Sequence, residues 1–144
     1  METVQTPVSQ GTQRILVTVH SELFPTIKEL RELLLETQKI RISYFLFSNK
    51  LTNRKLEYAK VATSFFTAVK KLETPEILFD GLTNDMEYMA DYFQLQGAFL
   101  SNIETGLRYI EIIDRTLDRK CQDIQNNRTL ILAIVAILIT IIIK

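Results

Sequence analysis

The sequence is poor in the residues that build disulfides, metal sites and tight turns. Its 144 residues include one cysteine, one histidine, four glycines, three prolines and no tryptophan. A single cysteine cannot form an intramolecular disulfide, which favours a reducing compartment. So few glycines and prolines suit long helices better than a turn-rich β fold. The formal net charge is zero, so the chain has no overall electrostatic preference for nucleic acid.

Patterns typical of catalysis and cofactor binding are also lacking. His20 and Cys121 lie about a hundred positions apart and make neither a zinc site nor a nucleophile–base pair. No glycine-rich phosphate loop occurs, and the acidic residues are spaced like those on the solvated flank of a helix. We therefore expect a protein that is not an enzyme, with no catalytic or metal-ligating residues and no cofactor.

Residues 1–24 form a polar leader that we expect to be flexible. Its first part, residues 1–13, has no basic region followed by an apolar run, so no secretory signal is indicated. Farther along the leader, Ile15, Val17 and Val19 alternate as in a short strand, but one strand without a partner would be unstable. The start of an amphipathic helix is the alternative, and the sequence leaves the two open.

From Pro25 onward the apolar residues follow a three–four spacing. Thirteen positions from Leu30 to Leu72 share this register; eleven of them are apolar, and no glycine or proline interrupts them. The spacing predicts one helix over about 26–72, roughly 70 Å long. A break near Ser48 and Asn49 is the alternative.

A short turn and a second helix are predicted next. In the sequence ETPE, residues 73–76, the threonine can cap a helix and the proline suits its first position. The three–four spacing then continues from Phe79 to Ile124, where twelve of fourteen positions are apolar. Because the turn is short, the second helix should run antiparallel to the first. The predicted fold is therefore all-α: a long, coiled-coil-like antiparallel helical hairpin over residues 25–125, followed by a C-terminal transmembrane helix.

Charge is divided between the two predicted helices. Residues 26–72 contain ten Lys and Arg against four Glu, whereas residues 73–105 contain seven acids and no base. One interpretation is that the two solvated flanks complement each other. The other is a face for anionic lipid headgroups, where each cation contributes about 1 kcal/mol. The residues of that face would be Lys50, Arg54, Lys55 and Lys60.

Two helices cannot bury all the apolar residues of such a hairpin. Phe66, Phe99, Ile112 and Ile113 are among those that lie off the predicted seam, so a partner is needed. The simplest partner is a second copy, which would give a four-helix antiparallel homodimer.

Gln96 and Asp114 interrupt the apolar seam of the second predicted helix. We interpret them as a polar layer that fixes register or oligomeric state. A glutamine among apolar heptads, upstream of a hydrophobic segment, also resembles the fusion helices of SNARE proteins. That likeness implies a helical protein partner as an alternative to a second copy of the chain.

The last part of the sequence, residues 129–144, is a candidate membrane anchor. Fifteen uncharged residues separate Arg128 from Lys144, about 22 Å as a helix, whereas a hydrocarbon core of about 30 Å needs about 20 residues. The run is apolar on all sides, unlike an amphipathic surface helix, and its terminal lysine can snorkel. A self-associating tail inside an oligomer is the alternative. The predicted anchor residues are Leu130, Ile131, Leu132, Ile134, Val135, Ile137, Leu138, Ile139, Ile141, Ile142 and Ile143.

The charges around this anchor predict its orientation and its membrane. Arg115, Arg119, Lys120 and Arg128 precede the run, and the positive-inside tendency then keeps the N-terminal part in the cytosol. A short span with a basic end suits a thin membrane. We expect a single-pass protein with a cytosolic N-terminus, in the endoplasmic reticulum or the mitochondrial outer membrane.

Several local features of residues 56–125 form a further pattern. They are the E-x-A step at Glu57 and Ala59, the linker 73–76, the pair Tyr109-Ile110 and the basic stretch 115–120. The stretch resembles the first two helices of a BAR-type domain, as in sorting-nexin BAR domains and the Chibby-interacting BAR-like proteins. The resemblance implies an elongated antiparallel dimer that binds, senses or bends membranes through basic side chains. The third long helix of those domains is replaced here by the apolar segment.

Together these patterns predict a tail-anchored helical membrane protein whose dimeric, BAR-like hairpin acts in membrane binding, shaping or trafficking. Its expected partners are membrane lipid and a second copy of the chain, with no nucleic acid. The alternative is a non-enzymatic regulator that works by protein contact at the membrane, as a SNARE-like or apoptosis-regulator-like helical bundle.

Overall fold

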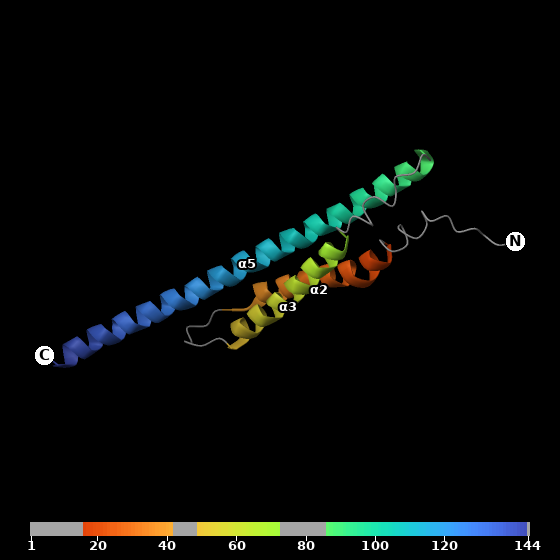
Figure 1. Ribbon diagram of the computed structural model, residues 1–144. Helices are drawn as coiled ribbons and strands as arrows, with labels where there is room; N and C mark the ends of the chain where they lie inside the picture. The colour runs from red at the N-terminus through yellow and green to blue at the C-terminus, as the bar shows by residue number, and fades with distance from the viewer. Residues whose placement is uncertain (1–15, 42–48, 73–85, 144) are drawn as a thin grey trace.

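The computed structural model describes residues 16–41, 49–72 and 86–143, with side chains of the last range described from residue 96 (Figure 1). Within these ranges every residue except Ile40 and Arg41 is helical, and none forms a strand. This confirms the all-α prediction and the long apolar C-terminal helix. The elements are η1 (Val19–Leu23), α2 (Phe24–Lys39), α3 (Asn49–Leu72) and α5 (Met86–Ile143).

The prediction of one helix over 26–72 is wrong. The backbone turns to an extended conformation at Ile40, with φ −64° and ψ 110°, and ends α2 at Lys39. The next described helix begins at Asn49. Its start agrees with the alternative prediction of a break near Ser48 and Asn49. The three–four spacing has the same register in both helices, so the spacing alone could not show that the chain folds back between them.

The first two long helices, α2 and α3, pack side by side in opposite directions. Near the start of this pair, the Lys71 ammonium lies 2.7 Å from the Glu22 carboxylate. At the other end, the Arg54 guanidinium lies 2.5 Å from Glu36. Residue numbers therefore rise along α2 as they fall along α3, which Figure 1 shows as opposite runs of colour.

Helix α5 lies against both of these helices. It runs antiparallel to α3, because Lys55 Nζ lies 3.9 Å from Asp118 Oδ1 and the Tyr58 hydroxyl donates to the Ile110 carbonyl at 3.5 Å. It therefore runs in the same direction as α2 (Figure 1). The hydrophobic core is thus shared by three helices rather than by the two arms of the predicted hairpin.

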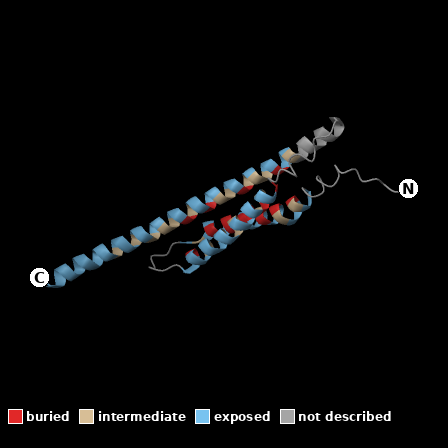
Figure 2. Ribbon diagram, viewed as in Figure 1, coloured by how far each residue is buried: buried red, intermediate tan, exposed pale blue. Residues whose placement is uncertain are grey.

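The buried face of α5 differs by one residue from the predicted seam. Phe99 and Ile113 are buried, although they were expected to lie off the seam. Leu100 and Leu107, which follow the three–four spacing of the predicted seam, are exposed. The buried face is shifted because α5 also packs against α2. A helix that packs against two others buries a wider face than a helix in a two-helix hairpin. Buried residues line the contact of α5 with the shorter helices (Figure 2). The core contains Val19, Leu23, Leu30, Leu33, Leu34, Leu51, Phe65, Ala68, Leu72, Phe99, Ile113 and Leu117.

The segment from residue 16 to residue 24 is helical and belongs to the core, so the predicted flexible leader does not extend through it. Val19 and Leu23 are buried, and the Phe24 N–H donates to the Val19 carbonyl five residues back. This π-helical turn accommodates Pro25, whose ring would clash with the preceding turn of a regular α-helix. Residues 1–15 lie outside the described part of the chain.

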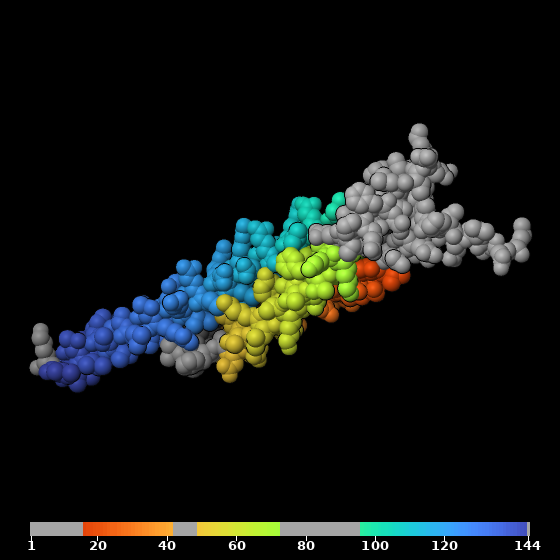
Figure 3. Space-filling model, in the orientation of Figure 1, coloured from red at the N-terminus to blue at the C-terminus, as the bar shows by residue number. Residues whose placement is uncertain are grey.

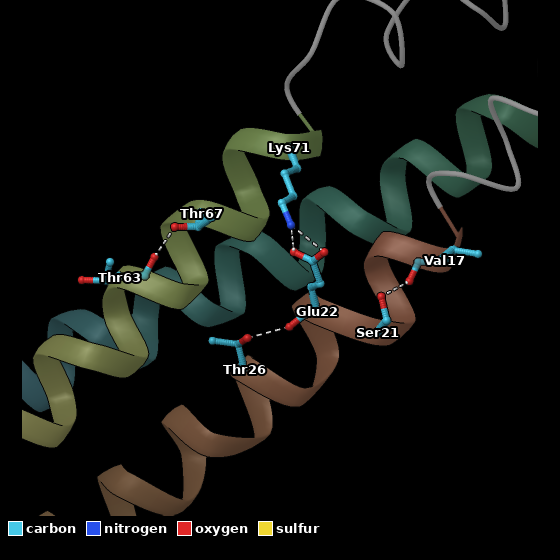
Figure 4. A network of polar contacts seen from close by, with 7 residues as sticks. All are labelled: Val17, Ser21, Glu22, Thr26, Thr63, Thr67 and Lys71. Atoms are coloured by element: carbon cyan, nitrogen blue, oxygen red, sulfur yellow. Dashed lines mark hydrogen bonds and ion pairs between the residues drawn. The ribbon is translucent and has the colours of Figure 1, made fainter.

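Polar contacts fasten this first segment to the end of α3 (Figure 4). The Glu22 carboxylate accepts two hydrogen bonds from Lys71 Nζ, at 2.7 and 2.8 Å. The Thr26 hydroxyl, which is buried, donates to the Glu22 carbonyl one turn back. A buried hydroxyl with a backbone acceptor avoids the penalty for an unsatisfied polar group.

Helix α5 continues without interruption from the core to Ile143, and its 58 residues correspond to about 87 Å. The core helix and the predicted C-terminal transmembrane segment are therefore parts of one helix. The C-terminal end of α5, blue in Figure 3, extends well beyond the other two helices. The predicted turn at residues 73–76 lies outside the described residues.

Candidate membrane interface

The C-terminal end of α5 is the one described helical segment that is long and apolar enough to cross a membrane. None of its most apolar stretch is buried within the protein. From Leu132 to Ile143 every residue is exposed, and Ile142 and Ile143 keep 81% and 80% of their surface. Such a run of exposed aliphatic side chains needs an apolar environment. All eleven predicted anchor residues lie on this segment, and Ile131 alone among them is half-buried.

The three-helix core ends close to the start of this apolar segment. Leu51 and Thr52, in the first turn of α3, line an open pocket of about 340 Å³ together with Gln125 and Arg128 of α5. The end of α2 is fixed nearby, because Lys120 Nζ donates to the Ile40 carbonyl at 2.6 Å. One end of the bundle therefore lies within a few helical turns of Thr129, where the uncharged run begins.

Basic side chains gather at this end of the bundle. Lys39 is the last residue of α2, and Arg41 lies two residues beyond it. Lys50 and Arg54 are in the first turns of α3. Together with Ile40 and Glu36 they line an open pocket of about 510 Å³. We call this the α2–α3 pocket. Its lining carries four positive charges and one negative charge.

A second basic group lies on the other side of the same end, between α2 and α5. Arg115, Arg119 and Lys120 line an open pocket there with Gln38 and one acid, Asp123. The Arg115 guanidinium pairs with Glu111 on its own helix. The excess of positive charge therefore extends around the end of the bundle that adjoins the apolar segment.

Charge changes sign farther along the α2–α3 groove. Glu29, Glu32 and Glu36 of α2 and Glu57 of α3 line a pocket with Leu33 and Val61. No group of described residues there or elsewhere could hold a metal ion through three or more acidic, histidine or cysteine ligands. The groove is therefore basic toward the apolar segment and acidic away from it.

The four residues predicted to form one lipid-binding face do not lie on a single face. Lys50 and Arg54 line the α2–α3 pocket, but Lys55 points to the groove between α3 and α5. Lys60 lies about 15 Å farther from that end, since each helical residue rises about 1.5 Å. Residues five and ten positions apart are also rotated by about 140° and 280° around a helix.

Arg54 also differs from the predicted role of a free cation. Its guanidinium is paired with Glu36 and with Glu57, both at 2.5 Å, and only 29% of its side chain is exposed. It therefore holds α2 against α3, and two carboxylates balance its charge. Lys39 and Arg41, which were not among the predicted lipid-binding residues, are exposed and line the same pocket as Lys50.

Lys55 and Tyr58 face α5 in a different electrostatic environment. The pKa of Lys55 is raised, chiefly by a hydrogen bond with the Cys121 side chain and also by the carboxylates of Asp118 and Asp114, while partial burial opposes the shift. Burial raises the pKa of the Tyr58 phenol, and the same two carboxylates add to the effect. These contacts join α3 to α5.

Within one chain, Gln96 and Asp114 do not form a buried polar layer. Asp114 is exposed at the edge of the α3–α5 contact, and Gln96 is half-buried. Asp114 was assigned to the seam because its spacing matched Leu107 and Leu117, but the buried face of α5 is centred on Ile113. An exposed carboxylate cannot fix register as a buried one would.

Comparison of the chain with protein-family models, with curated proteins and with solved structures finds no match.

Proposed function

We propose that the chain is a single-pass membrane protein, anchored by the C-terminal end of α5, whose helical bundle acts at the cytosolic membrane surface in membrane binding, shaping or trafficking. The observation that supports this most is the continuity of α5, which passes from the core into the apolar segment as one helix. Leu117, at the last fully buried turn, precedes Leu130 by about 20 Å of helix.

This continuity limits where the bundle can be. A flexible linker would let a cytosolic domain move away from the bilayer, whereas a helix fixes both distance and direction. With the apolar segment in a bilayer, the bundle would therefore remain at the surface. The basic side chains before the span favour the cytosolic side, in line with the positive-inside tendency.

A BAR-like homodimer is part of the proposal. Three helices of alternating direction support it, and so do exposed apolar residues such as Phe66 and Ile112, which a second copy could cover. Two other residues expected to need a partner, Phe99 and Ile113, are buried within one chain. With 16 and 24 residues, α2 and α3 are short, so such a dimer would be less elongated than the sequence predicted.

A protein-contact regulator is the second candidate, and one observation favours it. Leu100 and Leu107 lie two turns apart on the same face of α5, and they keep 53% and 44% of their surface. Apolar residues at this spacing are typical of a helix that receives another helix. In this alternative the bundle would bind a helical partner at the membrane and need not touch lipid.

The anchor is tested by following a fluorescent fusion of the full chain in cells, with and without residues 129–144. The full chain should remain in the membrane pellet after alkaline carbonate extraction, and the shortened chain should be released. A full chain that carbonate releases would refute the anchor.

Reconstitution distinguishes the two candidate functions. Full-length protein in liposomes should change vesicle shape or cluster vesicles if it acts on membranes. Unchanged vesicles, with specific capture of a helical partner that Leu107→Glu abolishes, would favour the regulator. Sedimentation in detergent tests the homodimer: a monomer at all concentrations would exclude it.

A further inference from the structure

We propose that Lys39, Arg41 and Lys50 form a binding site for the anionic headgroup of a membrane lipid, at the end of the α2–α3 pocket that faces the bilayer. This inference rests on the proposed function, because the membrane anchor brings the pocket to the lipid. The proposed site differs from the face predicted from the sequence. It keeps Lys50 and adds Lys39, at the end of α2, and Arg41, just after that helix.

The positive charge of this site is not balanced by the protein. Within the described ranges, Lys39, Arg41 and Lys50 form no ion pair. The pocket has one acid, Glu36, and Arg54 already pairs with it at 2.5 Å. Among the residues that line the pocket, the three exposed cations therefore have no carboxylate that pairs with them. Phosphate and carboxylate groups of lipid headgroups are the anions that such a cluster attracts.

The position of the pocket along α5 matches the headgroup layer. The Ile40 carbonyl is held by Lys120, which precedes Thr129 by nine residues or about 14 Å. The apolar run of fifteen residues is about five short of a full span. A span of about 20 residues that ends at Ile143 would start at Ile124, four residues or about 6 Å beyond Lys120, and Arg128 would snorkel from within it to the headgroups.

The headgroup region on each side of a bilayer is about 5 to 8 Å deep, half the difference between its total and hydrocarbon thickness. Lys and Arg side chains extend several ångströms from the backbone and place their charges in this layer. A short anchor thus draws the end of the bundle toward the headgroups. The acidic part of the groove, lined by Glu29, Glu32 and Glu57, lies farther from the bilayer, where it avoids repulsion.

The test uses full-length protein reconstituted in phosphatidylcholine bilayers that contain a small amount of spin-labelled lipid. The measured quantity is the association of spin-labelled phosphatidylserine relative to spin-labelled phosphatidylcholine. Wild-type protein should prefer phosphatidylserine at low salt, and the preference should fall as salt is raised. The triple variant Lys39→Gln, Arg41→Gln, Lys50→Gln should lower the ratio by about fivefold or more, the effect of at least one lost cation at a charged surface.

A matched control removes three other exposed cations, in the variant Lys28→Gln, Arg31→Gln, Lys60→Gln. Those residues lie farther from the anchor, and the ratio should stay within about twofold of wild type. An equal loss in the control, or no loss in the first variant, would overturn the site. Circular dichroism of both variants should match wild type, because all six positions are exposed.

A second arm distinguishes a lipid from a soluble anion. Glycerophosphoserine at millimolar concentration should leave the lipid preference nearly unchanged, because the site would use the bilayer to hold its ligand. Full displacement at that concentration would assign the site to soluble phosphates instead and overturn the lipid. Protein that enters the bilayer but shows no preference refutes only the headgroup site, whereas protein that does not enter it refutes the anchor as well.

Discussion

The Phe65 ring lies directly against Gly106, where α3 crosses α5. Both residues are buried, and a Cβ atom at residue 106 would overlap the outer edge of the ring. Glycine in a helix interior is about 1 kcal/mol less favourable than alanine, so close contact between the helices is the physical reason for a glycine here. At this contact α3 and α5 pack closely because residue 106 has no side chain.

Replacement of this glycine should destabilise the bundle. In Gly106→Ala, the new methyl group displaces a ring that is fully buried and cannot move freely, and overpacking of this kind costs about 1 to 3 kcal/mol. The gain in helix propensity offsets about 1 kcal/mol of that loss. Thermal unfolding of the full chain in detergent, followed by circular dichroism, should show a lower midpoint than wild type.

Gly97 is the matched control on the same helix. A Cβ atom there would meet nothing within 4 Å, so Gly97→Ala should raise the unfolding midpoint through helix propensity alone. The smaller side chain in Phe65→Leu should recover part of the loss when combined with Gly106→Ala. A midpoint that rises equally for both alanine variants would contradict the packing that we describe.

The segment before α2 should contribute to stability through its buried residues rather than its ion pair. Leu23→Ala removes a side chain that is fully buried, which should cost about 2 to 5 kcal/mol. Glu22→Gln breaks the exposed contact with Lys71, for which at most about 1 kcal/mol is expected. Chemical unfolding of both variants in low and high salt measures the difference. If Leu23→Ala unfolds like wild type, the segment does not contribute to the core and the prediction of a flexible leader through residue 24 is correct.

Alkaline pH should weaken the contact between α3 and α5 through Tyr58. Burial, with the nearby Asp114 and Asp118 carboxylates, raises the pKa of this phenol above its ordinary value near 10. The neutral form is thus favoured in the folded state. Its contribution to stability is complete below about pH 10 and is lost as the pH rises through the raised pKa.

This pH dependence is measured against Tyr58→Phe, which removes the ionisable group and keeps the ring. Between about pH 9 and 11 the unfolding midpoint of wild type should fall more steeply than that of the variant. Other groups titrate in this range too, so the comparison of the two slopes is what matters. Parallel curves would show that the phenol ionises equally in the folded and unfolded chains.

The apolar end of α5 should be sensitive to charge at its centre. In Ile137→Arg the arginine lies in the middle of the run, where insertion of a cation costs about 2.5 to 3.5 kcal/mol. The same change at Ile143, beside Lys144, lets the side chain snorkel to the surface. Carbonate extraction should release much more of the first variant than of the second. Equal retention of both would indicate that another part of the chain holds it to the membrane.

The helices themselves could be predicted because their signal is local. The three–four spacing of apolar residues indicated helix on both sides of residue 40 and along α5 as far as Ile124. The break after Lys39 could not be seen in this signal. Leu30 and Phe65 share a register whether the helix is continuous or folds back, and only tertiary packing decides between these cases.

The candidate site was partly visible for the same reason. Lys50 was selected because it lies in a basic stretch of sequence, but Lys39 and Arg41 join it only when α2 and α3 fold together. On α5, two adjacent apolar rows were present, and the choice of Leu100 and Leu107 over Phe99 and Ile113 assumed one partner helix instead of two. Long-range arrangement, rather than composition, determined each of these differences.

With its apolar end in a bilayer, as proposed, the uninterrupted α5 would tilt as one rigid rod. From Thr129 to Gln96 the helix extends about 50 Å beyond the apolar segment. Spans tilt by different angles in membranes of different thickness, and a change of 10° over this length would move the distal end by roughly 9 Å. In that arrangement a change in bilayer thickness would displace the end of the bundle that lies farthest from the lipid.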